Sequence, residues 1–348
     1  MSWAAPVSHI AEPEEISLCE RRSHLAASTA RADLLSCLNF SKERLPHMEY
    51  AMHSRAIVLV LPFIVMEMGC GAMSPPPSAQ TMATSSAAST EPQRRSMSLD
   101  GVTLSILAGG TGDPVIYVHG VVTTSNIFRK YLTAYSPAFR GIAVDLRGYG
   151  DSDKTPIGSN IEQFVSDLIH LADRLGIDKP VWVGVSMGGM ILQRLALNHP
   201  DRVRALVLVS TTDGAMILDR DLQTIGAPRD YREVSTHIIG ESFPPGTPPS
   251  LYQPLLDKIP TWNASVLREA LTSMSRFNVH GQLSRITAPT LVVVGAKDDV
   301  ATPAIAKGIQ AQIRGAQLVE FNTGHFMMAE DPERFRTVLG TFLATVHR

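Results

Sequence analysis

The stretch VWVGVSMGGM, residues 181–190, brings a run of apolar residues to a sudden stop at a serine. Ser186 stands between Gly184 and the pair Gly188 and Gly189. A serine in a sharp turn from strand to helix needs small neighbours, because its strained backbone brings the residues two before and two after it close together. The pattern G-x-S-x-G arises by chance in about one chain in ten of this length. The alternative is therefore an ordinary serine in a Gly-rich turn. The elements on either side of Ser186 distinguish this from a strained turn between a strand and a helix.

Continuous runs of Val, Ile and Leu recur along the chain and predict strands buried on both faces of a parallel sheet. They are residues 115–120, 141–150, 181–185, 205–210, 290–295 and 317–321, with two shorter runs around the turn pair Asp100–Gly101. Between the runs, apolar residues recur at helical spacing. This alternation predicts an α/β fold with a doubly wound sheet. Ser186 then follows a strand directly and opens a helix, which favours the strained turn.

A serine is a weak nucleophile unless a base and an orienting acid activate it. His325, in the loop after the last predicted strand, is the expected base. The acid is expected after the strand that ends at Gly295, where Asp298 is preferred and Asp299 is the alternative. Asp213 is a weaker third candidate. The sequence leaves this choice open.

Negative charge that develops on a reacting oxygen needs N–H donors. The Met187 N–H, at the start of the helix after Ser186, is one candidate, and the Val121 N–H, after the strand at 115–120, is the other. His119 is expected to order that loop rather than to act as a base.

Five stretches together resemble the α/β-hydrolase family, in the family's order Ser…Asp…His. They are HGVV (119–122), DLRGYGDS (145–152), GVSMGG (184–189), GAKDD (295–299) and GHFMMAEDPERF (324–335). The resemblance covers residues 97–348. It implies the α/β-hydrolase fold, a mostly parallel eight-stranded sheet with helices on both faces and a helical cap inserted between strands 6 and 7. It also implies that Asp145, Arg147 and Asp151 order the loop after the fourth strand.

Residues 211–288 interrupt the strand–helix alternation and are expected to form this cap. Their large apolar side chains must cover something, so Trp262, Phe243 and Phe277 are the expected substrate contacts.

The resemblance implies a serine hydrolase that cleaves a carboxylic ester, lactone or thioester through an acyl-enzyme. A carbon–carbon bond hydrolase and a cofactor-free perhydrolase on the same residues are alternatives, and a non-catalytic binding module is a further one. In the dehalogenase and epoxide-hydrolase branches of the family an aspartate replaces the serine, and Ser186 argues against both. The expected partner is a small ester-like molecule, with no cofactor and no metal.

The charge of the chain argues against nucleic acid as a partner. The formal net charge is −2 and no basic stripe is present. The composition is 44% hydrophobic and 18% charged, which allows a large buried core. The three cysteines, Cys19, Cys37 and Cys70, all lie in the first 70 residues, so the rest of the chain can hold neither a disulfide nor a thiolate metal site.

The first hundred residues have a different composition. Residues 52–70 place a basic start, an 11-residue apolar run and Gly-Cys in the order of a bacterial lipoprotein signal, which predicts export and a lipid anchor on Cys70. Residues 71–96 are expected to be a disordered linker. Translation would then begin at Met48 or Met52, and residues 1–51 would be a non-native or disordered extension. The alternative is an ordinary disordered extension on a cytoplasmic enzyme.

Overall fold

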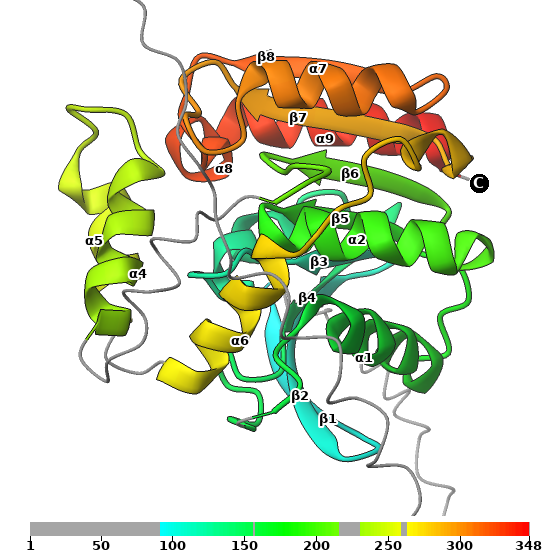
Figure 1. The fold of residues 1–348 in the computed structure, drawn as a ribbon. Helices are drawn as coiled ribbons and strands as arrows, with labels where there is room; N and C mark the ends of the chain where they lie inside the picture. Colours follow the sequence, from blue (N-terminus) through cyan, green and yellow to red (C-terminus); the bar gives the residue numbers. More distant parts are fainter. Residues whose placement is uncertain (1–90, 156, 216–229, 259–262, 348) are drawn as a thin grey trace, which may run out of the picture. The chain divides into compact units, whose positions relative to one another are not determined.

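Eight strands form one mostly parallel sheet in the computed structural model, which describes residues 91–155, 157–215, 230–258 and 263–347 (Figure 1). The strands are β1 Gln93–Leu99, β2 Val102–Gly110, β3 Asp113–Val118, β4 Phe139–Asp145, β5 Val181–Val185, β6 Ala205–Val209, β7 Thr290–Gly295 and β8 Gln317–Phe321. Their order is β1-β2-β4-β3-β5-β6-β7-β8, with the β1–β2 and β2–β4 pairs antiparallel and the others parallel. Each run that the sequence marked as apolar forms a strand, and the expected fold class is confirmed.

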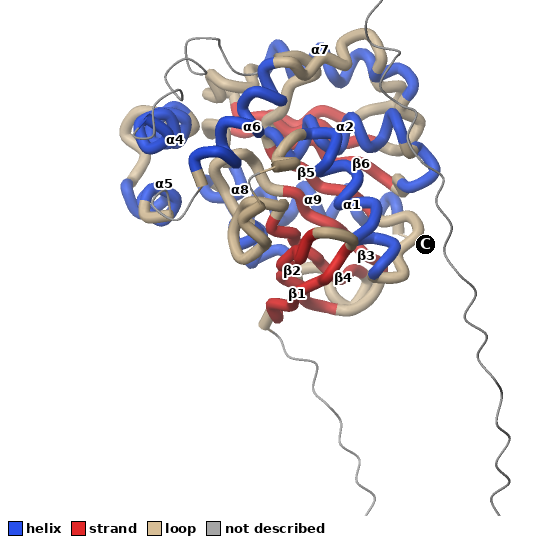
Figure 2. The backbone as a smooth tube through the Cα atoms, turned by 60° about the horizontal axis from the view of Figure 1, so that its bottom comes forward, coloured by secondary structure: helices blue, strands red, loops and turns tan. Residues whose placement is uncertain are grey.

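Helices cover both faces of this sheet (Figures 1 and 2). The described α-helices are α1 Ile161–Arg174, α2 Met187–Asn198, α4 Asp230–Glu241, α5 Pro249–Leu256, α6 Ala264–Ser275, α7 Pro303–Gln312, α8 Met327–Glu330 and α9 Pro332–Val346, of which α4 and α5 lie apart from the faces of the sheet. The short 3₁₀ helices are η1 Ser125–Tyr131, η2 Pro200–Arg202 and η4 Leu283–Arg285. Side chains of Asn160, Thr302 and Asp331 accept N–H groups at the starts of α1, α7 and α9, which fixes where these helices begin.

The central strands β5, β6 and β7 are buried along their whole length. Their continuous Val and Leu residues fit this position, because helices pack on both faces of a parallel sheet. Trp182 is the largest buried side chain of the core. Its one polar group also has a partner, since the indole N–H donates to the Arg202 carbonyl oxygen at 2.9 Å.

The domain begins earlier than the sequence predicted. β1 starts at Gln93, whereas residues up to 96 were expected to be linker. The sequence of β1 is mostly polar and so does not form a continuous apolar run, because β1 is an edge strand with a partly exposed face. Arg94 explains why it is ordered: its guanidinium lies 2.7 Å from the buried Asp145 and 3.1 Å from Asp151. The expectations for residues 1–51 and 52–70, and for Cys70, lie outside the described residues.

Between β6 and β7 the described residues form helices and no strand. In Figures 1 and 2, α4 and α5 lie side by side, while α6 packs against both α4 and α1. No helix in the described ranges is both long and apolar enough to cross a membrane.

Candidate active site

The turn at Ser186 has the strained form that its glycines predicted. Its φ of 54° and ψ of −120° place a non-glycine residue in a conformation that costs on the order of 1–3 kcal/mol. A Cβ on Gly184 would lie 2.5 Å from the Gly188 carbonyl oxygen, so the two glycines leave no room for side chains. The Ser186 N–H donates to the Val209 carbonyl oxygen at 2.9 Å, which fastens the turn to β6.

The loop after β3 lies against this turn. A Cβ on Gly188 would collide with the Val118 carbonyl oxygen, and one on Gly120 would lie 3.2 Å from the Cβ of Ser186. Within the described chain, neither the Val121 N–H nor the Met187 N–H donates to a protein acceptor. The loop of Val121 and the start of the Met187 helix thus both adjoin Ser186.

His119 connects the loops that follow β3 and β4. Its Nδ1–H donates to the Gly120 carbonyl oxygen at 2.7 Å, and its Nε2 accepts the Leu146 N–H at 3.1 Å. Burial lowers the pKa of His119, and the nearby Asp145 charge only partly opposes this. A neutral imidazole with both nitrogens occupied orders these loops, as the sequence predicted, and it is not placed to act as a base.

A buried pair joins the ends of β7 and β8. The Nδ1 of His325 lies 2.9 Å from Oδ2 of Asp298, and both side chains are almost completely buried. Oδ1 of Asp298 accepts the N–H groups of Val300 and Ala301 at 2.9 and 2.8 Å. Burial alone would raise the pKa of Asp298, but the charge and hydrogen bond of His325, the Ala301 N–H and the Ser210 hydroxyl together hold it below its usual range. Asp298 is therefore ionised near neutral pH.

The two alternative acids lie elsewhere. Asp299 is exposed. Asp213 binds Nδ1 of His280 at 2.8 Å and the Gln312 amide at 2.7 Å, while its carbonyl oxygen accepts the Val279 N–H at 2.8 Å. Asp213 thus closes the two ends of the segment that contains α4, α5 and α6.

Ser186 and the His325–Asp298 pair lie at the same edge of the sheet, because β5, β6, β7 and β8 are parallel and each group follows a strand's carboxyl end. Among the hydrogen bonds between described residues, none joins Ser186 to His325. In enzymes without substrate such contacts are often long and tighten only in the complex.

The loop that carries His325 is packed against the end of α4. The His325 N–H donates to the Ser242 carbonyl oxygen at 2.9 Å. A Cβ on Gly324 would lie 2.6 Å from Cδ of Pro244, so this glycine is required by close approach. The ring centroids of Phe243 and Phe326 lie 5.4 Å apart. The region expected to form the cap therefore touches the expected base directly.

Phe243 also lines a hollow of about 320 Å³. It lies between α4 and α5, and Ile239, Tyr252 and Leu256 line it with Phe243. The Phe243 and Tyr252 rings lie 5.8 Å apart. Phe243 thus contacts the His325 loop and also lines this apolar hollow. Trp262 lies outside the described residues.

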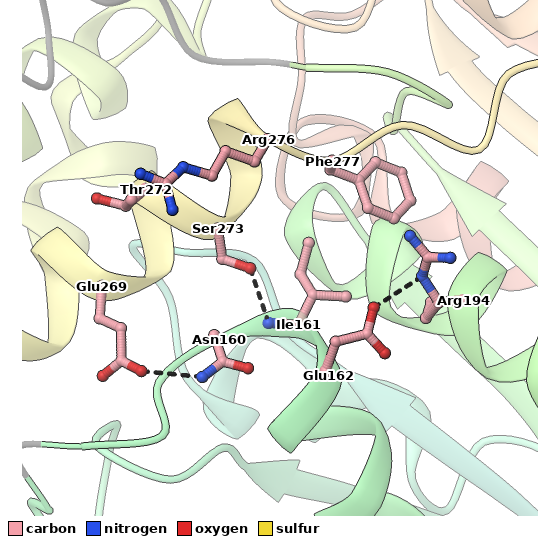
Figure 3. A pocket seen from close by; sticks show the side chains of 9 residues that line it. All are labelled: Asn160, Ile161, Glu162, Arg194, Glu269, Thr272, Ser273, Arg276 and Phe277. Carbon is pink, nitrogen blue, oxygen red and sulfur yellow. Dashed lines mark hydrogen bonds and ion pairs between the residues drawn. The ribbon is translucent and has the colours of Figure 1, made fainter. Parts of the chain in front are cut away.

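Phe277 lies in a different hollow, of about 400 Å³, between α1, α2 and α6 (Figure 3). There the Arg194 guanidinium carbon is 5.7 Å from the centre of the Phe277 ring, and its Nε pairs with Glu162 at 3.0 Å. Asn160 donates to Glu269 at 2.9 Å. The structure places Phe243 beside the His325 loop and Phe277 with α1 and α2.

The charged residues after β4 have structural partners, as the resemblance implied. Buried Asp145 accepts the Ser125 N–H at 2.7 Å and the Asp151 N–H at 3.0 Å. Arg147 makes two hydrogen bonds to Asp167, at 2.7 and 2.8 Å. In the ranges that the structure covers, no three His, Cys, Asp or Glu side chains group as metal ligands.

Sequence reasoning did not single out Ser210 and Ser242. Ser210 follows β6 with a φ of 45°, and its hydroxyl contributes to the low pKa of Asp298. Ser242 contributes its carbonyl oxygen to His325, and since every residue has one, no sequence signal marks it.

Known proteins resemble this chain over most of the described region. A sequence model of the alpha/beta hydrolase family matches residues 115–338. The 3-oxoadipate enol-lactonase 2 of Acinetobacter baylyi is 25% identical over 233 residues, which cover 64% of this chain and 85% of that protein. A putative non-heme haloperoxidase of Mycobacterium phage D29 is 27% identical over 247 residues, which cover 67% of this chain and 88% of that protein.

A solved structure gives the same result for the fold. A thermophilic esterase from Thermogutta terrifontis matches with a TM-score of 0.67 and 25% identity, and the match covers 74% of this chain and 100% of the esterase.

Proposed function

The chain belongs to the alpha/beta hydrolase family and is an enzyme of the serine hydrolase type, and we propose that it cleaves a carboxylic ester, lactone or thioester with Ser186 as the nucleophile. The observation that carries the proposal is the buried His325–Asp298 pair at the same edge of the sheet as the strained turn of Ser186. An ionised carboxylate that holds Nδ1–H leaves Nε2 as the proton acceptor.

The proposed reaction proceeds in two halves. Nε2 of His325 takes the Ser186 hydroxyl proton while Oγ bonds to the acyl carbon. The substrate oxygen gains a negative charge and accepts hydrogen bonds from the N–H groups of Val121 and Met187. The bond to the leaving oxygen or sulfur then breaks, and His325 returns the proton to that atom. Asp298 stays ionised and stabilises the imidazolium.

Water completes the cycle. His325 takes one proton from water, and the oxygen of that water bonds to the acyl carbon. When the bond to Ser186 breaks, the proton passes to its Oγ and the acid is released. With a lactone the leaving alcohol remains on the acyl group, so the product is a hydroxy acid.

The apolar side chains of the cap support an apolar group in the substrate. Phe243, which lines the α4–α5 hollow and packs against Phe326 of the His325 loop, is the proposed contact. Trp262 and Phe277 remain candidates from the sequence. The relatives named as an enol-lactonase and an esterase support the same class of carbonyl substrates.

Perhydrolysis is a second candidate, which the relative named as a haloperoxidase favours. In this reaction hydrogen peroxide replaces water in the second half, and the product is a peracid. Peracid formation from an ester and hydrogen peroxide, measured beside ester hydrolysis, separates the two reactions.

A fluorophosphonate probe tests the proposal, because it phosphonylates only an activated serine. The intact mass of the protein should rise by one phosphonyl group, and peptide mapping should place that group on Ser186. Ser186→Ala should remain unlabelled and lose several orders of magnitude in kcat. An unlabelled wild-type protein, or full activity in Ser186→Ala, would show the proposal to be wrong.

A further inference from the structure

The stretch after His325 contains a carboxylate that the proposed reaction does not use. Glu330 ends α8 and is half-buried. Both of its carboxylate oxygens lie 3.1 Å from the Gly324 N–H. The N–H groups of Gly324 and Phe326 both act to lower the pKa of this carboxyl group. The residue before His325 thus donates its N–H to this side chain.

The same short loop is also held by residues that directly follow α4. The His325 N–H is occupied by the Ser242 carbonyl oxygen, and Gly324 contacts Pro244 so closely that it has no space for a Cβ. The imidazole itself is bound through Nδ1 to Asp298. Two side chains bind the backbone of Gly324: the Glu330 carboxylate accepts its N–H, and the Thr323 hydroxyl donates to its carbonyl oxygen at 3.4 Å. The shorter contact, that of Glu330, is one that a substitution can remove.

We propose that Glu330 is a positioning residue for His325: by accepting the Gly324 N–H it fixes the backbone before the base and so directs Nε2 toward Ser186. The inference rests on the proposed serine hydrolase function. Alignment of this kind matters because a displacement of about 1 Å at a reacting group can cost about 100-fold in rate.

The surroundings of Glu330 do not by themselves favour an ionised carboxylate. Burial raises the pKa of Glu330. The N–H groups of Gly324 and Phe326 and the charge of Lys297 oppose this, whereas the charge of Asp298 raises the pKa further. Placing the Glu330 carboxylate near that of Asp298 is electrostatically unfavourable, and the N–H groups of the His325 loop partly offset this.

Three substitutions test the role, with Glu333 as the matched control. Glu333 lies on α9 close in sequence, but its side chain is 78% exposed and pairs with Arg336. Glu330→Ala, which removes both acceptors, should lower kcat for a small acetyl ester about 10- to 100-fold and leave KM within about twofold. Glu330→Gln keeps one acceptor oxygen and should stay within about threefold of wild type, while Glu330→Asp, which withdraws the carboxylate by one methylene, should fall between them.

Rates are expressed per folded molecule, with the folded fraction taken from urea unfolding curves. Glu333→Ala should keep the wild-type kcat. If Glu330→Ala loses stability but keeps the wild-type kcat, Glu330 is structural only and the inference is wrong. If Glu330→Ala does not fold, Glu330→Asp is the deciding variant. A kcat of Glu330→Asp equal to the kcat values of wild type and of Glu330→Gln would also overturn the inference. Fluorophosphonate labelling of the wild type, measured in parallel, reports on the proposed function separately.

Discussion

Asp298 and Asp299 are adjacent in sequence but lie in different environments. Asp298 is buried against His325, while Asp299 is exposed. The turn after β7 decides this, because the N–H groups of Val300 and Ala301 fold back onto the Asp298 carboxylate. Such a local turn depends on tertiary contacts, so the sequence could narrow the acid to two residues but could not choose between them.

Asp298→Asn should lower kcat on the order of 10³- to 10⁴-fold, because an amide that donates to Nδ1 favours the wrong tautomer of His325. Asp299→Asn, the matched control, should remain within about twofold of wild type. Steady-state kinetics on a chromogenic ester measure both. A larger loss in Asp299→Asn would move the orienting role to that residue.

His119 should make the stability of the fold depend on pH. Because burial lowers its pKa in the folded protein, the unfolded chain binds more protons below about pH 6.5. Stability from this residue is therefore complete above that pH and is lost as the pH falls, by at most about 1.4 kcal/mol per pH unit.

Urea unfolding at pH 7.5 and pH 5.5 measures this effect. Wild type should lose more free energy of unfolding between the two pH values than His119→Gln does. His170→Gln, which replaces an exposed histidine of α1, should keep the wild-type difference. An identical pH dependence in wild type and His119→Gln would contradict the assignment of a neutral, buried His119.

The buried strands of the sheet were predictable from the sequence, because each is a continuous apolar run, whereas the start of the polar edge strand β1 was not. The segment between β6 and β7 was predictable only as a helical insertion. Phe243 and Phe277 have the same kind of side chain there, yet one packs beside the His325 loop and the other against Arg194. Helical spacing gives the face of a helix but not the neighbour it meets.

The α4–α5 hollow should set the preference for the length of the acyl or alcohol chain. Tyr252→Ala removes part of its apolar lining, so kcat/KM for a hexanoyl or octanoyl ester should fall about tenfold. An acetyl ester has no long apolar chain to place in the hollow and should change by less than about twofold. Gln253→Ala, on the exposed face of α5, is the control. An equal loss on short and long esters would make the hollow a structural feature.

At the scale of the whole molecule, we propose that the hydrolase is exported and held by lipid on Cys70. The order of the basic start, apolar run, Gly-Cys and polar linker supports this. Multiple acylation of one cysteine would anchor the chain firmly, whereas a single acyl chain binds a membrane only marginally.

The mature chain recovered from its native host tests the proposal. Mass spectrometry should find an acylated Cys70 at the N-terminus in the membrane fraction. An unprocessed chain in the soluble cytosolic fraction would contradict it. Cys70→Ala provides the control, since it should remove the acylation and release the enzyme without changing kcat on a soluble ester.

The contact between Asp213 and Val279 has a consequence for how this enzyme can diversify. Asp213 and Val279 lie at the two ends of the insertion between β6 and β7 and are hydrogen-bonded to each other, so the insertion begins and ends at one place on the core. The entropic cost of closing such a loop grows only slowly with the number of residues in it. Recombination could therefore exchange or lengthen residues 214–278 as a module, provided that each new insert again supplies an acceptor for the His325 N–H, as Ser242 does. A lineage built in this way would keep one chemistry and acquire new specificities by replacing a single insert.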